Sequence, residues 1–404
     1  MLVRIGLQRQ SQSFGVLLRS LPGIDPGVVA ECLERIASGT TEPLSIRATA
    51  ATLLMQAETP LQPQKPTAKP IPHPLDCYWP NDPLTLRTLT WKLGRLTPPG
   101  GTIVYLGWPN AFADARSLLP NRKHLLLESN AMRSASHRSL TMPHEVLTLD
   151  VSRDELPEVR GDTIIADPPW YPDELMAFLW AAARLAKPGA HVLLALPPDG
   201  TRPGIDQERR ALLDWAVVCG LRPRELRPGV LGYLSPPFER AALAARGVAG
   251  TPSNWRYGDL LVCAATPTEL PPRPRPERDD WLSWHLSGLP IRIRADSGES
   301  SGSISGVKLL ESIVDGDVLD TVSRRAAIRQ RARVWTSCNR VYTSTHPAVL
   351  AAIVDAMEAG LPIAIAAAAR VRRALTRRER EAVLDVSMRL RRLVGRELRE
   401  HGLH

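Results

Sequence analysis

The stretch TIIADPPW, residues 163–170, decides how the centre of this chain folds. Its first half is an apolar, β-branched run typical of a buried strand, and a helical pattern begins directly afterwards at residue 172. Asp167 is therefore expected at the carboxyl end of a strand in an open α/β sheet. Because ligands of such sheets bind in the crevice at this edge, Asp167 is the first candidate functional residue.

Helical and strand patterns alternate around this stretch, from residue 82 to residue 267. Helices are expected over residues 84–96 and 172–187. The expected strands cover residues 102–106, 124–127, 146–149, 163–166 and 190–196, followed by a closing antiparallel pair at 230–234 and 259–264. This alternation predicts an α/β fold class with a doubly wound, Rossmann-like sheet.

Two proline-rich segments separate this central region from flanking regions. Apolar residues recur at helical spacing in four flanking segments, residues 26–38, 46–57, 348–360 and 378–399. A strand pair is expected over residues 281–294 and a flexible loop over 296–306. The predicted domains are a helical N-terminal region (1–57), a proline-rich linker (58–81), the Rossmann-like domain (82–267), a second proline-rich linker (268–276) and a basic, mainly helical C-terminal domain (277–404).

The composition is that of a soluble globular protein, with 44% hydrophobic and 23% charged residues among 404. The sequence contains no run of 18 apolar residues, so no membrane span is expected. The N-terminus lacks the apolar core of a signal peptide. The five cysteines show no CxxC spacing and the nine histidines no metal-ligand spacing. We therefore expect reduced thiols, a cytoplasmic location and no metal site.

The net charge of +9 is concentrated near the C-terminus. From residue 324 onward the chain has 17 arginines, no lysine and 7 acids. A basic module beside a nearly neutral one indicates a polyanionic partner, most simply nucleic acid, although a solvated arginine-rich surface gives the same pattern. In the segment RARVWTSCNRVYTS, Trp335 and Tyr342 alternate with arginines, which suits either a grip on single-stranded nucleic acid or a buried strand.

Four positions in the central region carry a family resemblance. They are the loop Leu106-Gly107-Trp108-Pro109-Asn110 after the first strand, Glu128 at the end of the second, Asp150 after the third, and Asp167-Pro168-Pro169-Trp170 after the fourth. With its strand order, this region resembles the class I S-adenosylmethionine-dependent methyltransferases. The tetrapeptide fits the Asp/Asn/Ser-Pro-Pro-aromatic motif of the members that methylate amino nitrogens.

The resemblance implies a cofactor site and therefore S-adenosylmethionine as the cofactor. Gly107 and Trp108 are expected near the methionine end of the cofactor. Glu128 matches the acid that accepts both ribose hydroxyls, and Asp150 the residue near the adenine amino group. One carboxylate at a strand end can accept two hydroxyl donors at once, which accounts for the choice of residue type.

The motif from Asp167 to Trp170 implies a site for the target nitrogen. Asp167 and the carbonyl of Pro168 would accept hydrogen bonds from an exocyclic amine and aim its lone pair at the methyl group. Pro168 and Pro169 stiffen the loop and have no N–H to compete for these acceptors. Trp170 offers a face on which the target base can stack, once the base has been flipped out of a duplex.

The sequence therefore predicts a methyltransferase acting on an exocyclic amino nitrogen, with adenine N6 of DNA or RNA as the first target. Nucleic acid is the expected partner, through the basic C-terminal region, and a protein partner is also possible. A second proline pair, in Ser235-Pro236-Pro237-Phe238, is expected to form a structural turn or a pocket wall.

Two alternatives remain open at this point. The first loop has one glycine, followed by Trp108 and Pro109, where these methyltransferases usually have an acid-x-Gly-x-Gly pattern. A catalytically inactive scaffold that binds nucleic acid or a protein would explain this departure. The layout is also similar to the branched-chain polyamine synthases, which are aminopropyltransferases. Those enzymes have acids after the loop glycine to hold a cationic amine, and this chain has none there.

Overall fold

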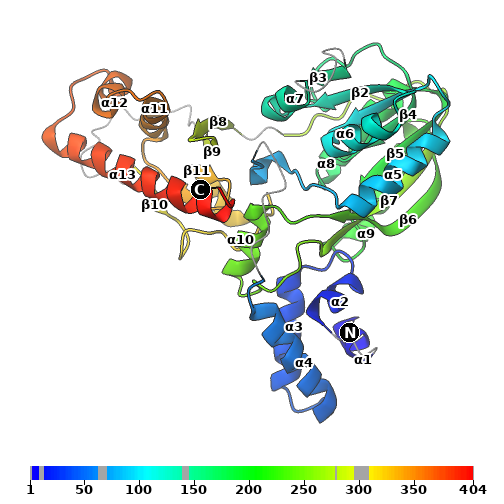
Figure 1. Ribbon diagram of the computed structural model, residues 1–404, viewed down its shortest axis with the longest axis horizontal. Helices are drawn as coiled ribbons and strands as arrows, with labels where there is room; N and C mark the ends of the chain where they lie inside the picture. The colour runs from blue at the N-terminus through cyan, green and yellow to red at the C-terminus, as the bar shows by residue number, and fades with distance from the viewer. Residues whose placement is uncertain are drawn as a thin grey trace. The chain divides into compact units, whose positions relative to one another are not determined.

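The computed structural model describes residues 2–8, 13–61, 71–138, 145–277, 280–294 and 309–403 (Figure 1). The chain forms two compact units. Unit 1 comprises Met1–Ala57, Trp79–Ser235 and Thr251–Glu277, and unit 2 comprises Glu58–Tyr78, Pro236–Gly250 and Arg278–His404. The first 57 residues therefore belong to the same unit as most of the predicted Rossmann-like domain. The loop predicted at residues 296–306 lies outside the described residues.

Unit 1 is built on a seven-stranded sheet with the order β3-β2-β1-β4-β5-β7-β6. Its strands are β1 (Thr102–Leu106), β2 (Lys123–Glu128), β3 (Val146–Thr148), β4 (Gly161–Ala166), β5 (Ala186–Leu196), β6 (Leu221–Tyr233) and β7 (Arg256–Ala265). The first five strands pair in parallel, whereas β7 is antiparallel to both of its neighbours. The predicted doubly wound sheet with a closing antiparallel pair is confirmed.

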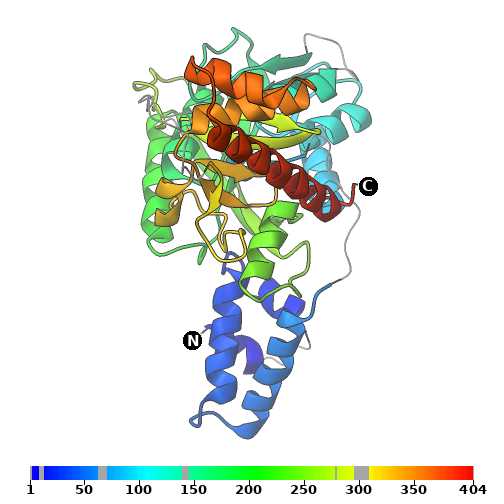
Figure 2. The same cartoon turned by 90° about the vertical axis from the view of Figure 1, so that its left-hand side faces the viewer.

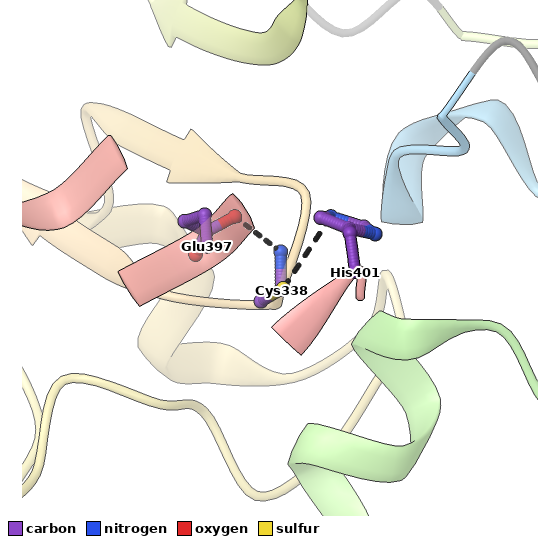
Figure 3. A group of neighbouring side chains, drawn as sticks. All are labelled: Cys338, Glu397 and His401. Atoms are coloured by element: carbon purple, nitrogen blue, oxygen red, sulfur yellow. Dashed lines mark hydrogen bonds between the residues drawn. The ribbon is translucent and has the colours of Figure 1, made fainter. Parts of the chain in front are cut away.

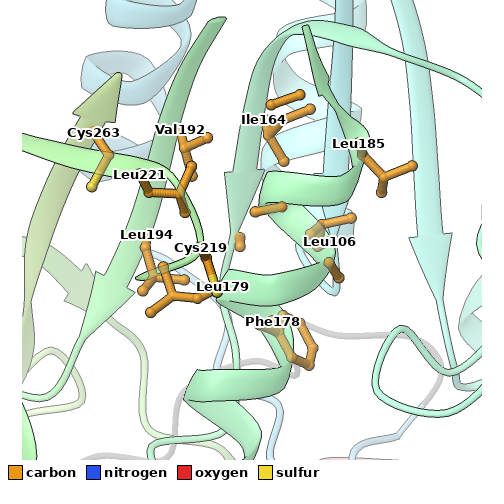
Figure 4. Packing of buried hydrophobic residues seen from close by; sticks show 14 of the residues in the cluster. Leu106, Ile164, Phe178, Leu179, Leu185, Val192, Leu194, Cys219, Leu221 and Cys263 are labelled. Carbon is orange, nitrogen blue, oxygen red and sulfur yellow. The ribbon is translucent and has the colours of Figure 1, made fainter. Parts of the chain in front are cut away.

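Helices cover both faces of this sheet because successive strand residues point to opposite sides. Ile103 and Tyr105 pack with helices α5 (Pro83–Leu96) and α6 (Pro109–Leu118). Leu106 packs on the other face, with α8 (Pro172–Leu185) and α9 (Ile205–Val218). Figure 4 shows this second cluster, in which Phe178 and Leu179 of α8 lie against strand residues. A further helix, α7 (Ala131–Arg138), follows β2.

The N-terminal region is helical in its described part, with α1 (Leu2–Gln8), α2 (Phe14–Arg19), α3 (Pro26–Ser38) and α4 (Leu44–Glu58). Helices α3 and α4 match those predicted over residues 26–38 and 46–57, whereas α1 and α2 were not predicted individually. Asp25 caps α3, because its Oδ1 accepts a hydrogen bond of 2.8 Å from the Gly27 amide. Figure 2 shows α3 and α4 side by side. None of the helices in the described part of the chain is long and apolar enough to cross a membrane.

Strands β5 and β6 are longer than expected. The helix predicted to run to residue 187 ends at Leu185, because Lys187 precedes a proline and such residues disfavour helical geometry. Strand β6 has 13 residues and includes the polar run before residue 230. The arginines and prolines of β6 interrupt the apolar pattern from which strands are predicted, but a strand at a sheet edge accommodates both residue types. Irregular pairing with β7 at two places accommodates them here.

Unit 2 contains a five-stranded sheet with the order β10-β12-β11-β9-β8. Its strands are β8 (Trp281–Leu286), β9 (Leu289–Arg294), β10 (Glu311–Ser312), β11 (Val334–Thr336) and β12 (Val341–Thr343). Its helices are α10 (Pro237–Ala245), α11 (Pro347–Glu358), α12 (Ile363–Val371) and α13 (Arg377–Glu400), with short 3-10 turns at Pro74–Asp76 and Ala327–Arg331. The predicted strand pair and helices are confirmed, and β11 and β12 fall in the segment for which a buried strand was one of two interpretations, whereas β10, with only two residues, was not expected.

The aromatic residues of the RARVWTSCNRVYTS segment belong to the core of unit 2. Trp335 on β11 and Tyr342 on β12 are 1% and 3% exposed. The buried-strand interpretation of this segment is therefore correct. Part of the predicted proline-rich linker also packs in this unit: Asp76 pairs with Arg292 at 2.6 Å, and His73 Nε2 lies 3.0 Å from the Trp335 carbonyl.

Candidate active site

The candidate site lies where β1 and β4 end side by side in the middle of the sheet. The strand order reverses between these two strands, and open α/β sheets bind ligands at this point. The Asp167 amide donates to the Leu106 carbonyl at 3.2 Å, and the Gly107 amide donates to the Leu127 carbonyl at 2.9 Å. Gly107 has φ +61°, which favours glycine, and an added Cβ would lie 3.3 Å from Phe178. The structure therefore brings Gly107 and Asp167 together.

Among the described residues, the Asp167 carboxyl has one hydrogen-bond donor, the phenol of Tyr233, at 2.9 Å from Oδ1. Burial raises the pKa of Asp167 to about 7, and the hydrogen bond from Tyr233 opposes that rise. Tyr233 is the last residue of β6 and is 2% exposed. A carboxyl group that titrates near neutral pH at a strand end is characteristic of a site that binds or moves a proton.

A buried polar chain connects Tyr233 to the loop after β1. Asn81 forms an isolated antiparallel bridge with Tyr233, and its Oδ1 accepts a hydrogen bond of 2.6 Å from Trp108 Nε1. Trp108 is fully buried and packs in the cluster beneath α5 and α6. The Trp108 indole thus connects the loop after β1 to Asp167 through Asn81 and Tyr233. Its predicted contact with a cofactor stays a prediction.

Trp170 belongs to a tryptophan cluster that also contains Trp79, Trp255 and Arg256. The Arg256 guanidinium lies 5.1, 5.7 and 4.7 Å from the ring centres of Trp79, Trp170 and Trp255. The ring of Trp170 also meets that of Tyr233 edge-on, with centres 5.7 Å apart. A cation held among indole faces is stabilised by the ring quadrupoles. The tryptophan cluster therefore places a positive charge and flat apolar surfaces at the strand end where Arg256 pairs with Tyr233, the hydrogen-bond donor to Asp167.

The two prolines shape the turn from β4 into α8. The Pro169 carbonyl accepts a 2.7 Å hydrogen bond from the Tyr171 amide, which closes the turn just before α8 begins. Pro168 is buried, and no described group donates to its carbonyl. This carbonyl therefore has no donor among the described residues, and its predicted role as an acceptor stays a prediction.

Glu128 lies at the end of β2 and is 2% exposed. Its Oε1 accepts hydrogen bonds from the Asn130 amide at 2.8 Å and from Arg133 at 3.2 Å. Asn110 lies in the first turn of α6, directly after β1, and its Nδ2 is buried and has no hydrogen-bond partner in the described part of the chain. An acid at the end of β2 and an unpartnered donor just after β1 thus occur on the sheet edge that also carries Asp167.

Asp150 is used in a local turn. Its Oδ1 accepts hydrogen bonds from the amide and the hydroxyl of Ser152, at 2.9 and 2.6 Å. Oδ2 lies 3.5 Å from Arg153, and the side chain is 39% exposed. These contacts do not bring Asp150 into the hydrogen-bond network of Asp167. Its predicted place near an adenine remains a prediction.

Sequence reasoning missed Asn81, Tyr233 and Arg256. The directions of the strands indicate the positions of two of them, Tyr233 and Arg256. Strand β6 is parallel to β5 and ends at the same edge as β4, whereas the antiparallel β7 begins there. The last residue of β6 and the first of β7 therefore meet at the site, where Tyr233 pairs with Arg256. The predicted strand 230–234 already contained Tyr233, but the predicted start of β7 at residue 259 left Arg256 outside the strand.

A second polar cluster occurs in unit 2, where Cys338, Glu397 and His401 lie within 4.8 Å of one another (Figure 3). Burial lowers the pKa of His401 to about 4 and raises that of the Cys338 thiol. The Glu397 carboxylate accepts hydrogen bonds from the Cys338 amide at 2.8 Å and from Arg340 at 2.7 Å. Arg340 places a positive charge where a metal ion would need a free carboxylate oxygen. These contacts favour a structural network over a metal site.

Comparison with known proteins gave structural likenesses alone. No family model and no curated protein matches the chain. The branched-chain polyamine synthase of Thermus thermophilus, in complex with N4-aminopropylspermidine and 5'-methylthioadenosine, is similar with 16% identity over 69% of this chain and 90% of that chain, at a TM-score of 0.48. A TehB-like SAM-dependent methyltransferase from Corynebacterium glutamicum has 14% identity over 46% of this chain and 90% of that chain, at a TM-score of 0.31. TrmN from Thermus thermophilus has 19% identity over 45% of this chain and 48% of that chain, at a TM-score of 0.30. At these identities the likeness lies in the backbone and assigns no role to any residue.

Proposed function

We propose that unit 1 transfers a methyl group from S-adenosylmethionine to an exocyclic amino nitrogen of a nucleobase, with adenine N6 of DNA or RNA as the first target. The observation that carries this proposal is the Asp167 carboxyl, held by Tyr233 beside Gly107 at the reversal of the strand order. The Asp-Pro-Pro-Trp motif at this place adds the resemblance to amino-nitrogen methyltransferases. The tryptophan cluster supports a flat, aromatic acceptor.

The residues around the first two strand ends suit the proposed cofactor. Glu128 would accept the ribose hydroxyls while sharing its carboxylate with Arg133. The unpartnered Nδ2 of Asn110 lies in the first turn of α6, where backbone amides and the helix dipole favour an anionic group. Asn110 would therefore hold the cofactor carboxylate. When bound, the cofactor supplies an electrophilic methyl group on a positively charged sulfur.

Asp167 and Pro168 would orient the acceptor amine. The ionised carboxylate and the Pro168 carbonyl each accept one N–H, so the nitrogen lone pair points away from both. The nitrogen gains one methyl group and releases one proton, and Asp167 is the nearest group able to take that proton. Its pKa of about 7 matches this exchange at neutral pH. Trp170 supplies a stacking face for the base, and Arg256 a positive charge at its edge.

The aminopropyltransferase alternative has less support. Its cationic acceptor needs acids after the loop glycine, whereas this chain has the buried Trp108 at that place. Arg256 adds a positive charge against the Trp170 ring, which disfavours a polycation. The scaffold alternative differs from the proposed function in one measurable property, the binding of S-adenosylmethionine.

Replacing Glu128 by glutamine is expected to weaken S-adenosylmethionine binding about 10- to 100-fold, because hydrogen bonds to a charged acceptor contribute about 1.5–3 kcal/mol. Calorimetric titration with the cofactor and with S-adenosylhomocysteine measures this loss. Glu155→Gln, a change at an exposed acid outside the site, is the control and should bind as the wild type does. A folded wild-type protein that binds neither compound would favour the scaffold alternative.

Replacing Tyr233 by phenylalanine is expected to shift the pH profile of methyl transfer. The Tyr233 hydrogen bond stabilises the Asp167 carboxylate, so its loss raises the Asp167 pKa further above about 7. Since the carboxylate is the active form, the acidic limb of the kcat profile should move up by about one pH unit. In the control Tyr257→Phe, the lost hydroxyl has no hydrogen bond to the described residues, so the profile should stay in place. An unchanged limb in Tyr233→Phe would exclude Asp167 as the titrating group.

A further inference from the structure

A groove with a volume of about 600 Å³ runs along helix α13 in unit 2. Its lining residues come from α13 and from the strands and loops against which this helix packs: Leu310, Asp317, Tyr342, Arg389, Arg392, Leu393, Gly395, Arg396 and Arg399. The lining thus combines an apolar floor with four arginines and one acid. No residue of the candidate active site takes part in it.

The four arginines form a ladder on one side of α13. They recur at intervals of three and four residues, which is the spacing of neighbours on a helix face, and the ladder spans roughly 15 Å at 1.5 Å per residue. Arg396 pairs with Asp317 at 3.0 Å. Within the described part of the chain, Arg389, Arg392 and Arg399 have no acidic partner. The groove therefore has an excess of positive charge.

Gly395 leaves the backbone of α13 open between these arginines. A glycine inside a helix costs about 1 kcal/mol relative to alanine, so its presence needs a reason. Packing does not supply one, because an added Cβ would contact only Arg399, at an ordinary 3.7 Å. A glycine does, however, allow a ligand to approach the helix closely at the middle of the ladder.

We propose that this groove binds the phosphodiester backbone of the nucleic acid that carries the methylated base, an inference that rests on the proposed function. Guanidinium groups bind phosphate oxygens in a bidentate manner. The ladder is extended and does not converge on one point, which suits successive phosphates better than a single phosphate. At about 3.4 Å of helix axis per nucleotide, roughly 15 Å accommodates several of them. The one acid of the groove already has a partner and adds little repulsion.

The test uses the full chain without cofactor and measures the anisotropy of labelled RNA and DNA oligonucleotides, single- and double-stranded. The triple variant Arg389→Gln, Arg392→Gln and Arg399→Gln removes only arginines that have no acidic partner. It should weaken binding at least about tenfold and lower the salt slope of log K by about 2. The matched control changes Arg378, Arg380 and Arg391 to glutamine, which removes the same charge from α13 outside the groove. It should retain nearly all affinity.

A second variant separates shape from charge. Gly395→Leu fills the groove without altering any charge and should also weaken binding, whereas its helix content should not fall. Equal losses in the triple variant and its control would overturn the proposal. Unchanged oligonucleotide binding in Gly395→Leu would also overturn it. A third overturning result would be that the wild-type protein binds tripolyphosphate or poly-glutamate as tightly as it binds an oligonucleotide. Because cofactor titration is independent of this assay, failure here leaves the proposed function to be judged by its own test.

Discussion

Replacing Asp167 by asparagine should lower kcat for methyl transfer at least about 1,000-fold and leave unit 1 folded. An amide nitrogen cannot accept a proton or the N–H of the amine, and acid–base groups typically contribute about 10²–10⁴-fold to a rate. Asparagine keeps the size of the side chain and one oxygen to accept the Tyr233 hydrogen bond. The measurement is the transfer of a labelled methyl group to an oligonucleotide acceptor.

Stability separates a functional role of Asp167 from a structural one. The raised pKa of about 7 means that the folded protein binds this proton more tightly than the unfolded chain. The stabilisation from the protonated form is therefore present at pH 4 and is lost as the pH rises through 7. Since asparagine is always neutral, Asp167→Asn should be more stable than the wild type to urea at pH 8, and equally stable at pH 4.

The control for this variant is Asp162→Asn, at the opposite end of the same strand, where Asp162 pairs with Lys187 at 2.8 Å. It should retain wild-type kcat once any loss of stability has been corrected. Wild-type turnover in Asp167→Asn would exclude the proposed role of the carboxylate. A similar loss of activity in both variants would indicate a general effect on β4 instead.

The positions of Gly107, Glu128 and Asp167 were predictable because each follows a short apolar strand. In a parallel sheet every such strand ends at the same edge, so periodicity in the sequence was enough to place them together. Arg133 lies five residues after its partner Glu128, so this contact is local as well. The part of the site that the sequence revealed is the part made by parallel strands.

The remaining site residues depend on pairings between distant segments. Tyr233 reaches Asp167 only because β7 inserts between β5 and β6, and no local pattern encodes this insertion. Trp108 was predicted near a cofactor, but its indole bonds to Asn81, 27 residues earlier in the chain. In unit 2, strands of two or three residues are too short to show a period and form only through tertiary packing.

Glu397 illustrates how strongly such packing can depend on one buried group. Its carboxylate accepts four hydrogen bonds that attach α13 to the turn between β11 and β12. The donors are the hydroxyls of Thr336 and Ser337 at 2.7 and 2.6 Å, the Cys338 amide at 2.8 Å and Arg340 at 2.7 Å. Glu397→Ala should therefore destabilise unit 2 by about 3–5 kcal/mol, because it leaves a buried guanidinium and three further donors without this acceptor.

Hydrogen exchange of α13 and of the β11–β12 peptides measures this loss as a fall in opening free energy. Glu381→Ala is the matched control on the same helix, because its pair with Arg377 is exposed and should contribute less than about 1 kcal/mol. The same experiment decides between a network and a metal site. The four donors occupy the Glu397 oxygens, so a chelator should leave exchange in the wild type unchanged. Faster exchange of α13 after chelation would instead mean that Cys338 and His401 hold a metal ion.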